Sequence, residues 1–280
     1  MHERELFDET LDINSTNNYE ISIQVSLNGF SFSLLDTFRK RFVMLREYKL
    51  NGREAELSTQ LSDIAGKDDF LGKSYRKYRV IFSFEKSTLI PSSLYDPALK
   101  DEYFTLNHSL SAESVVSNNK LTEPDAYLLF DLRQDLLDTT CRLFPEATLS
   151  HQARPLLFDS FIGARKLSSR YIRVNIEDTY FNITIIKERN LEFFNTFRYR
   201  NSSDILYYLL NTLEHLGVNK QEPVYLSGNI MKFDELYNNM LKYIMTLKFA
   251  SPVGDFSVSY IFDEIGVHRY SNLFNIVSCA

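Results

Sequence analysis

The stretch IQVSLNGFSFSLLDTFRKRFVMLREYKL, from Ile23 to Leu50, decides the fold, because it has the pattern of three consecutive strands and returns later in the chain. The second version, IRVNIEDTYFNITIIKERNLEFFNTFRYR, runs from Ile172 to Arg200. An alignment of the two sets Val25 on Val174, Leu27 on Ile176, Phe32 on Phe181, Leu34 on Ile183 and Tyr48 on Phe197. A repeated three-strand unit predicts two similar halves with a cleft between them.

The strands of each copy follow from period-two alternation of apolar residues. The first copy predicts strands over 20–27, 30–36 and 42–50, with Asn28-Gly29 as the hairpin turn between the first two. The second copy predicts strands over 171–177, 180–187 and 191–200.

The rest of the chain alternates helical and strand-like patterns. Helices are predicted over 51–70 with Gly66 as the stop, from Pro91, over 133–145, from Pro155 to Ala164, over 202–218 with Ser202 or Ser203 as the cap, and from Phe233 to Leu247. Strands are predicted over 78–84, 126–132, 147–153, 223–230 and 257–265. The segment from Glu113 to Pro124 is interpreted as polar and turn-rich, and the apolar tail 271–280 is expected to pack. This order predicts an α/β protein with mixed sheets covered by helices on two sides.

Composition limits the function classes. The chain has 280 residues, 44% hydrophobic and 24% charged, which is an ordinary globular balance. The formal net charge of −6 argues against broad nucleic-acid binding, which needs clustered Lys and Arg. No apolar run approaches the ~20 residues of a membrane span. The two cysteines form no CxxC pair, and the charged N-terminus has no secretory pattern, so we expect a cytoplasmic protein with reduced thiols.

Known catalytic and metal motifs are missing from the sequence. The five histidines show no HExxH or His-x-His spacing, and no Walker A, GxSxG or GxGxxG pattern occurs. The aromatic residues Phe193, Phe194, Phe197 and Tyr199 are interpreted first as core and cross-strand pairs, with a partner-binding surface as the alternative for Phe197 and Tyr199.

The element order resembles the actin-like ATPase fold, in which two ribonuclease-H-like α/β/α halves face each other across a nucleotide cleft. From Tyr19 onward the chain also resembles an uncharacterised family, common in Bacteroidetes, that is described as having this fold without a known function. Three segments carry that resemblance, LIPSSLYD (Leu89–Asp96), PVYLSGNI (Pro223–Ile230) and HRYSNLFN (His268–Asn275). The resemblance implies an N-terminal half over 1–168 and a C-terminal half over 169–280.

Active relatives are expected to bind ATP through an Asp-x-Gly turn after the first strand of each half and a Gly-Gly turn late in the second. The corresponding turn of the first half contains Asn28 and Gly29 but no acid. The turn of the second half has Glu177 and Asp178 but no glycine, and the late turn, Ser227-Gly228-Asn229, has one glycine where two are expected. Phosphates need glycine for close backbone approach, and Mg²⁺ needs carboxylate oxygens.

Each motif is therefore half lost. The leading hypothesis is a non-catalytic protein without a cofactor that acts by binding an unidentified protein, with no role in nucleic-acid binding. The alternative is a divergent ATPase or phosphotransferase that binds ATP with magnesium through these seven residues, including Glu177 or Asp178 for the metal. An assembly-forming protein is a third class, and an oligomer is compatible with all three.

Overall fold

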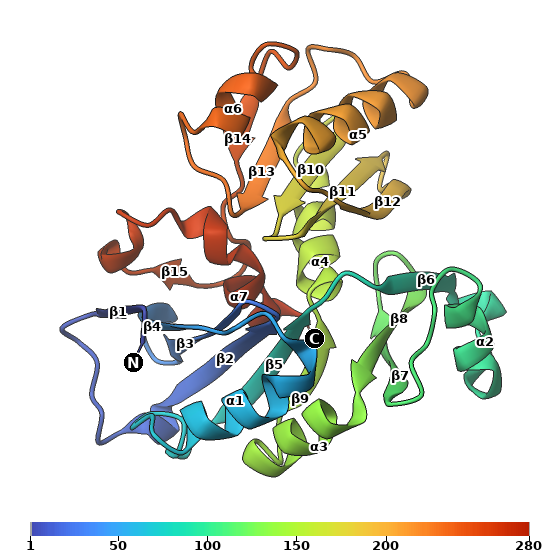
Figure 1. Ribbon diagram of the computed structural model, residues 1–280. Coiled ribbons are helices and arrows are strands. Elements are labelled where there is room, and N and C mark those ends of the chain that lie inside the picture. Colours follow the sequence, from blue (N-terminus) through green and yellow to red (C-terminus); the bar gives the residue numbers. More distant parts are fainter. Residues whose placement is uncertain (1, 280) are drawn as a thin grey trace. The chain divides into compact units, whose positions relative to one another are not determined.

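The computed structural model describes residues 2–279, which form two compact units (Figure 1). Unit 1 consists of Met1–Arg154, Gly254–Glu264 and Ile276–Ala280, and unit 2 of Pro155–Val253 and Ile265–Asn275. The chain thus leaves each unit and returns to it near the end of the sequence. The division of the duplicated halves at residues 168 and 169 stays a prediction.

The strands define the sheets of both units. In chain order they are β1 (Arg4–Phe7), β2 (Tyr19–Ser26), β3 (Gly29–Asp36), β4 (Arg41–Lys49), β5 (Lys77–Ser83), β6 (Ser87–Pro91), β7 (Ser114–Leu121), β8 (Ala126–Arg133), β9 (Thr148–His151), β10 (Tyr171–Ile176), β11 (Tyr180–Lys187), β12 (Asn190–Arg198), β13 (Val224–Gly228), β14 (Leu247–Phe249) and β15 (Ser257–Val258). The helices are α1 (Leu57–Ala65), α2 (Lys100–Thr105), α3 (Gln134–Leu143), α4 (Ala153–Ala164), α5 (Ser202–His215), α6 (Glu235–Met240) and α7 (Ser271–Asn275).

The main sheet of unit 1 has the order β1–β4–β3–β2–β5–β9, and β15 pairs with β4. The pairs β2–β3 and β3–β4 are antiparallel, whereas β5 joins β2 and β9 joins β5 in parallel. The hairpins of the sequence therefore supply the antiparallel part, and the crossovers through the helices supply the parallel part, as the patterns predict.

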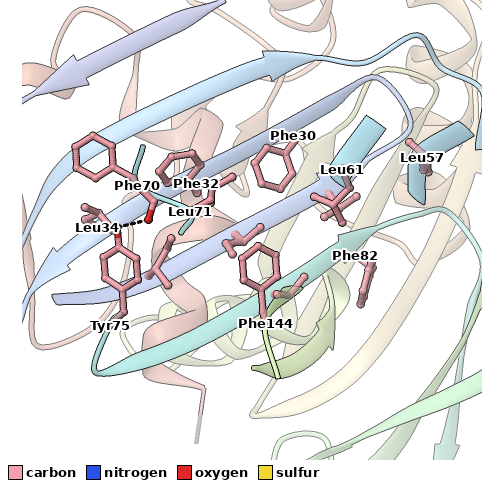
Figure 2. Packing of buried hydrophobic residues seen from close by; sticks show 14 of the residues in the cluster. Phe30, Phe32, Leu34, Leu57, Leu61, Phe70, Leu71, Tyr75, Phe82 and Phe144 are labelled. Carbon is pink, nitrogen blue, oxygen red and sulfur yellow. Dashed lines mark hydrogen bonds between the residues drawn. The ribbon is translucent and has the colours of Figure 1, made fainter. Parts of the chain in front are cut away.

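One face of this sheet carries the core of unit 1. Alternate residues of β2, β3 and β5 point into it, among them Phe30, Phe32 and Phe82, each at most 1% exposed (Figure 2). Figure 2 also shows Tyr75, whose hydroxyl donates to the Phe70 carbonyl oxygen at 3.0 Å and so keeps a polar atom satisfied in this core. Burial of one such phenylalanine stabilises the fold by about 2–3 kcal/mol.

A small sheet, β6–β8–β7, stands beside the main sheet within unit 1, and α2 lies near it (Figure 1). The turn-rich interpretation of Glu113–Pro124 is wrong, because most of that segment is β7. Its pattern SVVSNNKL shows little hydrophobic alternation, and the strand forms through its ladder with β8.

The sheet of unit 2 has the order β12–β11–β10–β13–β14. It repeats the order β4–β3–β2–β5–β9 of unit 1, again with an antiparallel meander followed by two parallel strands. The core packs on one face of this sheet and includes Ile205 and Leu209 of α5 and Met240 of α6. The repeated strand order agrees with the two similar halves expected from the sequence.

The register corrects the alignment of the two copies. Val25 pairs with Phe30 across the first hairpin, and Ile176 pairs with Phe181 across the second. Val25 is therefore equivalent to Ile176 and not to Val174. The error is a shift of two residues, which leaves every side chain on the same face of the strand and is invisible to a period-two pattern.

The third strand of each copy is aligned as expected. Phe30 pairs with Tyr48, and Phe181 pairs with Phe197, so the match of Tyr48 with Phe197 is confirmed. The loop between the second and third strands is longer in the first copy, which accounts for the shift. Each copy also has one register shift at an equivalent place, between Leu34 and Leu35 in β3 and between Ile185 and Ile186 in β11.

Three predicted elements in the last third differ from the structure. The long helix from Phe233 to Leu247 is wrong, because α6 is short and the chain then turns into β14. The predicted strand over 257–265 is only β15, followed by a 3-10 turn at Tyr260–Phe262. The cap of α5 is Asn201, whose side chain accepts hydrogen bonds from the next backbone N–H groups, and not Ser202 or Ser203.

The stretch from Pro91 also differs from a single helix. Pro91 ends β6, and two 3-10 turns, Ser92–Leu94 and Pro97–Leu99, precede α2. The predicted packing of the tail is confirmed for the described residues, because Leu273, Phe274 and Ile276 are at most 2% exposed. Across residues 2–279, every helix is too short or too polar to cross a bilayer.

Candidate functional site

The turn between β2 and β3 in unit 1 closes on itself. The Ser26 hydroxyl accepts a hydrogen bond from the Gly29 N–H and donates to the Gly29 carbonyl oxygen, both at 3.0 Å. Gly29 does not use the left-handed backbone region, so its conformation does not depend on being glycine. Asn28 and Gly29 thus form a hairpin turn whose near side chain is a hydroxyl and not a carboxylate.

Residues after β4 hold the outside of this turn. The N–H of Leu50 donates to the Asn28 carbonyl oxygen at 2.9 Å, and the N–H of Gly52 donates to the Leu27 carbonyl oxygen at 3.1 Å. Gly52 has φ +76°, and a Cβ there would lie 2.8 Å from the Asn28 side-chain oxygen. The close approach that glycine permits here is between two parts of the same chain.

In unit 2, the turn between β10 and β11 carries both predicted acids. The Glu177 N–H donates to the Tyr180 carbonyl oxygen at 2.9 Å, and the Tyr199 hydroxyl donates to the Glu177 carbonyl oxygen at 2.6 Å. Asp178 is exposed and accepts a hydrogen bond at Oδ1 from the Asn229 side-chain amide at 2.9 Å.

The turn that follows β13 packs directly on the end of β10. Gly228 has φ +78°, and a Cβ at this position would lie 2.1 Å from the Ile176 carbonyl oxygen. The Asn229 N–H donates to that same oxygen at 2.6 Å. Glycine is therefore required at 228, but the group that approaches it is the protein's own backbone.

The structure brings five of the seven predicted residues together in unit 2, namely Glu177, Asp178, Ser227, Gly228 and Asn229. Asn229 links the two turns, because its side-chain amide donates to Asp178. Its side-chain oxygen also accepts a hydrogen bond from Arg269 Nη2 at 3.3 Å. The other two, Asn28 and Gly29, belong to unit 1.

A buried chain of polar side chains runs beneath these turns. Arg173 Nε donates to Ser227 Oγ at 3.0 Å, and Ser227 Oγ donates to Asn175 Oδ1 at 2.8 Å. The Asn175 amide then donates to Glu177 Oε1 at 2.9 Å. Because Arg173, Asn175 and Ser227 are at most 1% exposed, this chain ties the β10–β11 turn to the interior of the sheet.

The chain of hydrogen bonds begins at a buried ion pair. Arg173 Nη2 lies 2.7 Å from the Asp159 carboxylate of α4, and it also donates to Ser271 Oγ of α7 at 3.1 Å. Burial raises the pKa of Asp159, and the guanidinium of Arg173 offsets part of that rise.

Glu177, at the outer end, has the most perturbed carboxyl of the two turns. Burial raises the pKa of Glu177 to about 7; the hydrogen bond from Asn175 opposes this rise, and the negative charge of Asp178 adds to it. The group therefore changes its charge near neutral pH, within the range that suits proton transfer.

Sequence reasoning missed Arg173, Asn175, Asp159 and Arg269. A signal for the first two was present, because Arg173 and Asn175 alternate with apolar residues along β10 and so had to share one face. Asp159 and Arg269 lie on other elements, and nothing in their local sequence marks them.

The residues of these turns are poorly suited to hold magnesium and ATP. Among residues 2–279, no three His, Cys, Asp or Glu side chains gather into a group that could hold a metal. The Asp178 carboxylate already accepts a hydrogen bond from the Asn229 side chain, and the carbonyl oxygen of Ile176 lies against Gly228 where a phosphate would have to approach. In unit 1, Ser26 stands where a first-half acid would be expected.

Comparison with known proteins gives a family and a fold. The family described as "Protein of unknown function (DUF3822)" matches residues 8–247. A Bacteroides thetaiotaomicron protein with actin-like ATPase fold and unknown function has a TM-score of 0.82 at 21% identity, covering 97% of this chain and 100% of its own.

Another similar structure is that of a PilM–PilN type IV pilus biogenesis complex. It has a TM-score of 0.62 at 9% identity, over 93% of this chain and 98% of that one. No curated protein matches the sequence. At these identities the likeness establishes the fold alone, so the predicted α/β, actin-like ATPase fold is confirmed.

Proposed function

The chain belongs to the family of proteins of unknown function DUF3822, and we propose from its own geometry that it is a non-catalytic protein of actin-like fold that acts by binding another protein. No nucleotide, metal or nucleic acid takes part in this role. The proposal includes a cytoplasmic location, which draws on the low cysteine content of the sequence, two cysteines in 280 residues.

One observation carries the non-catalytic part. The polar groups that an actin-like ATPase would turn toward phosphate and Mg²⁺ are bonded to each other in this protein. Asn229 bridges Asp178 and the backbone of Ile176, and the Ile176 carbonyl oxygen lies 2.1 Å from the place that a Cβ of residue 228 would take. Nucleotide binding would have to break these bonds without a free glycine loop to replace them.

The first-half turn supports the same conclusion. Phosphoryl transfer depends on a positioned metal, and the side chain nearest to Gly29 in this turn is the hydroxyl of Ser26. A hydroxyl that is already engaged by the turn's own backbone supplies no negative charge for a hydrated Mg²⁺.

A second candidate function is a divergent Mg-ATP-dependent ATPase or phosphotransferase. The observation that favours it is Glu177, whose pKa of about 7 suits a general base, beside Asp178, Gly228 and Asn229. Glu177 or Asp178 would hold the metal, and the Gly228 turn would contact the nucleotide.

Thermal unfolding with and without Mg-ATP separates the two candidates. A ligand at a hundred times its Kd stabilises a protein by about 2.7 kcal/mol, which raises Tm by roughly 5 °C at this size. We expect no change in Tm at millimolar Mg-ATP. A rise of several degrees that disappears in Asp178→Asn or Glu177→Gln, but persists in the exposed control Glu214→Gln, would overturn the non-catalytic proposal.

The interaction part draws on the fold. A chain of this fold occurs in a PilM–PilN complex, so the architecture is compatible with a role in binding another polypeptide. The surface that such a partner would use must come from this chain's own residues.

A further inference from the structure

Strand β12 forms one edge of the unit 2 sheet. It is nine residues long, and among residues 2–279 no strand pairs with its outer side. Asn190, Asn195 and Arg198 are exposed, and the other residues of the strand are partly buried. A long edge strand of this kind presents a row of backbone groups that can pair with another strand.

The hydrogen bonds of β12 fix which backbone groups face outward. The Tyr199 N–H donates to the Thr179 carbonyl oxygen at 3.2 Å, so in the regular stretch from Phe193 to Arg198 the odd-numbered residues point their backbone groups toward β11. Even-numbered residues point theirs to the outer side. Consistent with this, the Thr196 N–H is met by its neighbour's side chain, Asn195 Oδ1, at 2.9 Å.

Aromatic side chains line one face of the same edge. Phe193 and Phe197 stack with ring centroids 6.4 Å apart, and Phe197 stacks on Tyr208 of α5 at 4.9 Å. Tyr207, 66% exposed, continues the group beside Tyr208. Phe193 and Phe197 are half-buried against the core of unit 2, whereas Tyr207 and Tyr208 are exposed, and exposed tyrosines are enriched at protein interfaces.

The usual protections of an edge are weak in β12. No Lys or Pro interrupts the segment 190–198. The register shift leaves Glu192 as the extra residue of a bulge, but the bulge comes before Phe193, so the stretch from Phe193 to Arg198 stays regular.

The sequence of this edge is complementary to itself in the antiparallel direction. With Asn195 opposite the Asn195 of a second copy, Phe193 faces Phe197 and Phe194 faces Thr196 on both sides of the centre. Glu192, the bulge residue, is held by Arg170 at 2.6 Å and lies at the opposite end of the strand from Arg198. The two Arg198 side chains are therefore far apart in this arrangement, whereas a parallel in-register partner would place them together. The outward backbone groups of Phe194 and Thr196 face one another as a hydrogen-bonded pair.

We propose that β12 pairs antiparallel with β12 of a second copy of this chain, with the two-fold axis at Asn195. This isologous contact joins the two unit 2 sheets into one continuous sheet. This proposal rests on the protein-binding role proposed above, and it names a second copy of the chain as the partner. In the pair, the Thr196 N–H exchanges its bond to Asn195 for the Phe194 carbonyl oxygen of the second copy.

A cysteine on the axis tests this register in the full chain. In the Cys141→Ser/Cys279→Ser background, Asn195→Cys sets two thiols on a non-hydrogen-bonded antiparallel pair, where the Cα atoms are about 4.5 Å apart and a disulfide can form. We expect a disulfide-linked dimer on mild oxidation. The control is exposed Arg198→Cys, whose two thiols would be roughly 20 Å apart in this register. Equal cross-linking of the two variants, or none in either, overturns the proposal.

Sedimentation equilibrium gives a second measurement without cross-linking. We expect the wild type to dimerise with increasing concentration, and Asn195→Lys to weaken the dimer at least tenfold, because two lysines meet at the axis. The matched control, Gln221→Lys on an exposed loop of the same unit, should dimerise as the wild type does. A wild type that stays monomeric at 100 µM, or an unchanged Asn195→Lys, would sink the idea. Neither readout involves nucleotide, so a failure here is distinguishable from a failure of the Mg-ATP test.

Discussion

Arg173 and Asp159 form an ion pair 2.7 Å long in which both side chains are almost completely buried, at 0% and 1% exposure. Arg173 projects from the middle of β10 and Asp159 from α4, so the pair joins the sheet of unit 2 to the helix that covers its polar face. Arg173 also donates to Ser227, Tyr171 and Ser271. The guanidinium is thus the centre from which the polar chain to Glu177 starts.

Removal of one partner of this pair should be costly. Asp159→Ala leaves a buried guanidinium without its counter-charge, and we expect a loss of about 3–5 kcal/mol in the free energy of unfolding. The double variant Asp159→Leu/Arg173→Met removes both charges and should lose less than Asp159→Ala alone. Urea unfolding measures both; a double variant that is the less stable of the two would contradict this account.

Glu177 should make stability depend on pH. Its folded pKa of about 7 exceeds the ordinary 4.5, so the folded state holds the proton more tightly, and this stabilisation is present below pH 4.5 and is lost as pH rises through 7. Glu177→Gln removes the dependence. Relative to wild type, the variant should gain up to about 3 kcal/mol between pH 4.5 and 7.5. The same exchange at exposed Glu214 is the control, and identical pH profiles for the two variants would refute the assignment.

Gly228 and Gly217 offer a matched comparison of strain and space. Both have positive φ, +78° and +59°, but a Cβ at 228 meets the Ile176 carbonyl oxygen at 2.1 Å, and one at 217 meets nothing within 4 Å. Gly217→Ala should cost only the conformational strain, about 1–2 kcal/mol. Gly228→Ala should cost several kcal/mol more or prevent unit 2 from folding, as measured by chemical denaturation. Equal losses would mean that the turn moves away from β10 without resistance.

His151 should act in the opposite sense to Glu177. Burial lowers the pKa of His151 to about 4, although the hydrogen bond to the Phe84 carbonyl oxygen opposes this. The unfolded chain takes up the proton near pH 6.5, so stability is lost as pH falls from 6.5 to 4, by about 3 kcal/mol. His151→Gln should be less stable than wild type at pH 7.5, and the difference should shrink at pH 4.5. The exposed control His215→Gln should not reproduce that change in unfolding titrations.

The N-cap of α5 can be assigned by two single substitutions. Asn201 Oδ1 accepts from the N–H groups of Ser203 and Asp204 at 2.9 and 3.1 Å. Asn201→Ala should therefore destabilise the protein by about 1 kcal/mol. Ser203→Ala, at a position inside the helix, should change the free energy of unfolding by a few tenths of a kcal/mol at most, since alanine is a good helix former. If Ser203→Ala lowered the free energy of unfolding more than Asn201→Ala does, Ser203 and not Asn201 would be the N-cap.

The sequence predicted the two three-strand meanders well because alternation and turns are local signals. The hairpins, α1 with its stop at Gly66, and β5 all lie close to their expected places. The exact equivalence of the two copies could not be predicted, because a two-residue shift keeps Val25 and its neighbours on the same faces. Only the pairing of Val25 with Phe30, compared with that of Ile176 with Phe181, reveals the two-residue shift.

The errors have a physical pattern. The helical spacing between Phe233 and Leu247 is real, but Phe233 adopts φ +72° and the chain turns after Met240, so tertiary packing overrides the local preference. β7 is a polar segment that becomes a strand only through its partner β8.

The candidate site was predicted in part. Glu177, Asp178, Gly228 and Asn229 were singled out because the resemblance to the actin-like fold implies nucleotide motifs at these turns. The structure brings the two turns together through the bonds of Asn229 to Asp178 and to the Ile176 carbonyl oxygen. Their engagement with each other could not be foreseen, since it depends on the distance between the ends of β10 and β13.

The return of the chain to unit 1 affects how the protein folds during synthesis. β15 completes the ladder with β4, and the Val277 carbonyl oxygen accepts from Arg79 of β5 at 3.4 Å. The ribosome makes these segments after almost all of unit 2. The first-made unit must therefore wait, with Arg41 and Phe42 of β4 lacking their partner strand and Arg79 lacking its bond to Val277, until the second has been translated. The order of translation and the order of completion of the two units are reversed, so a stalled or truncated chain would leave the N-terminal unit as the incomplete one.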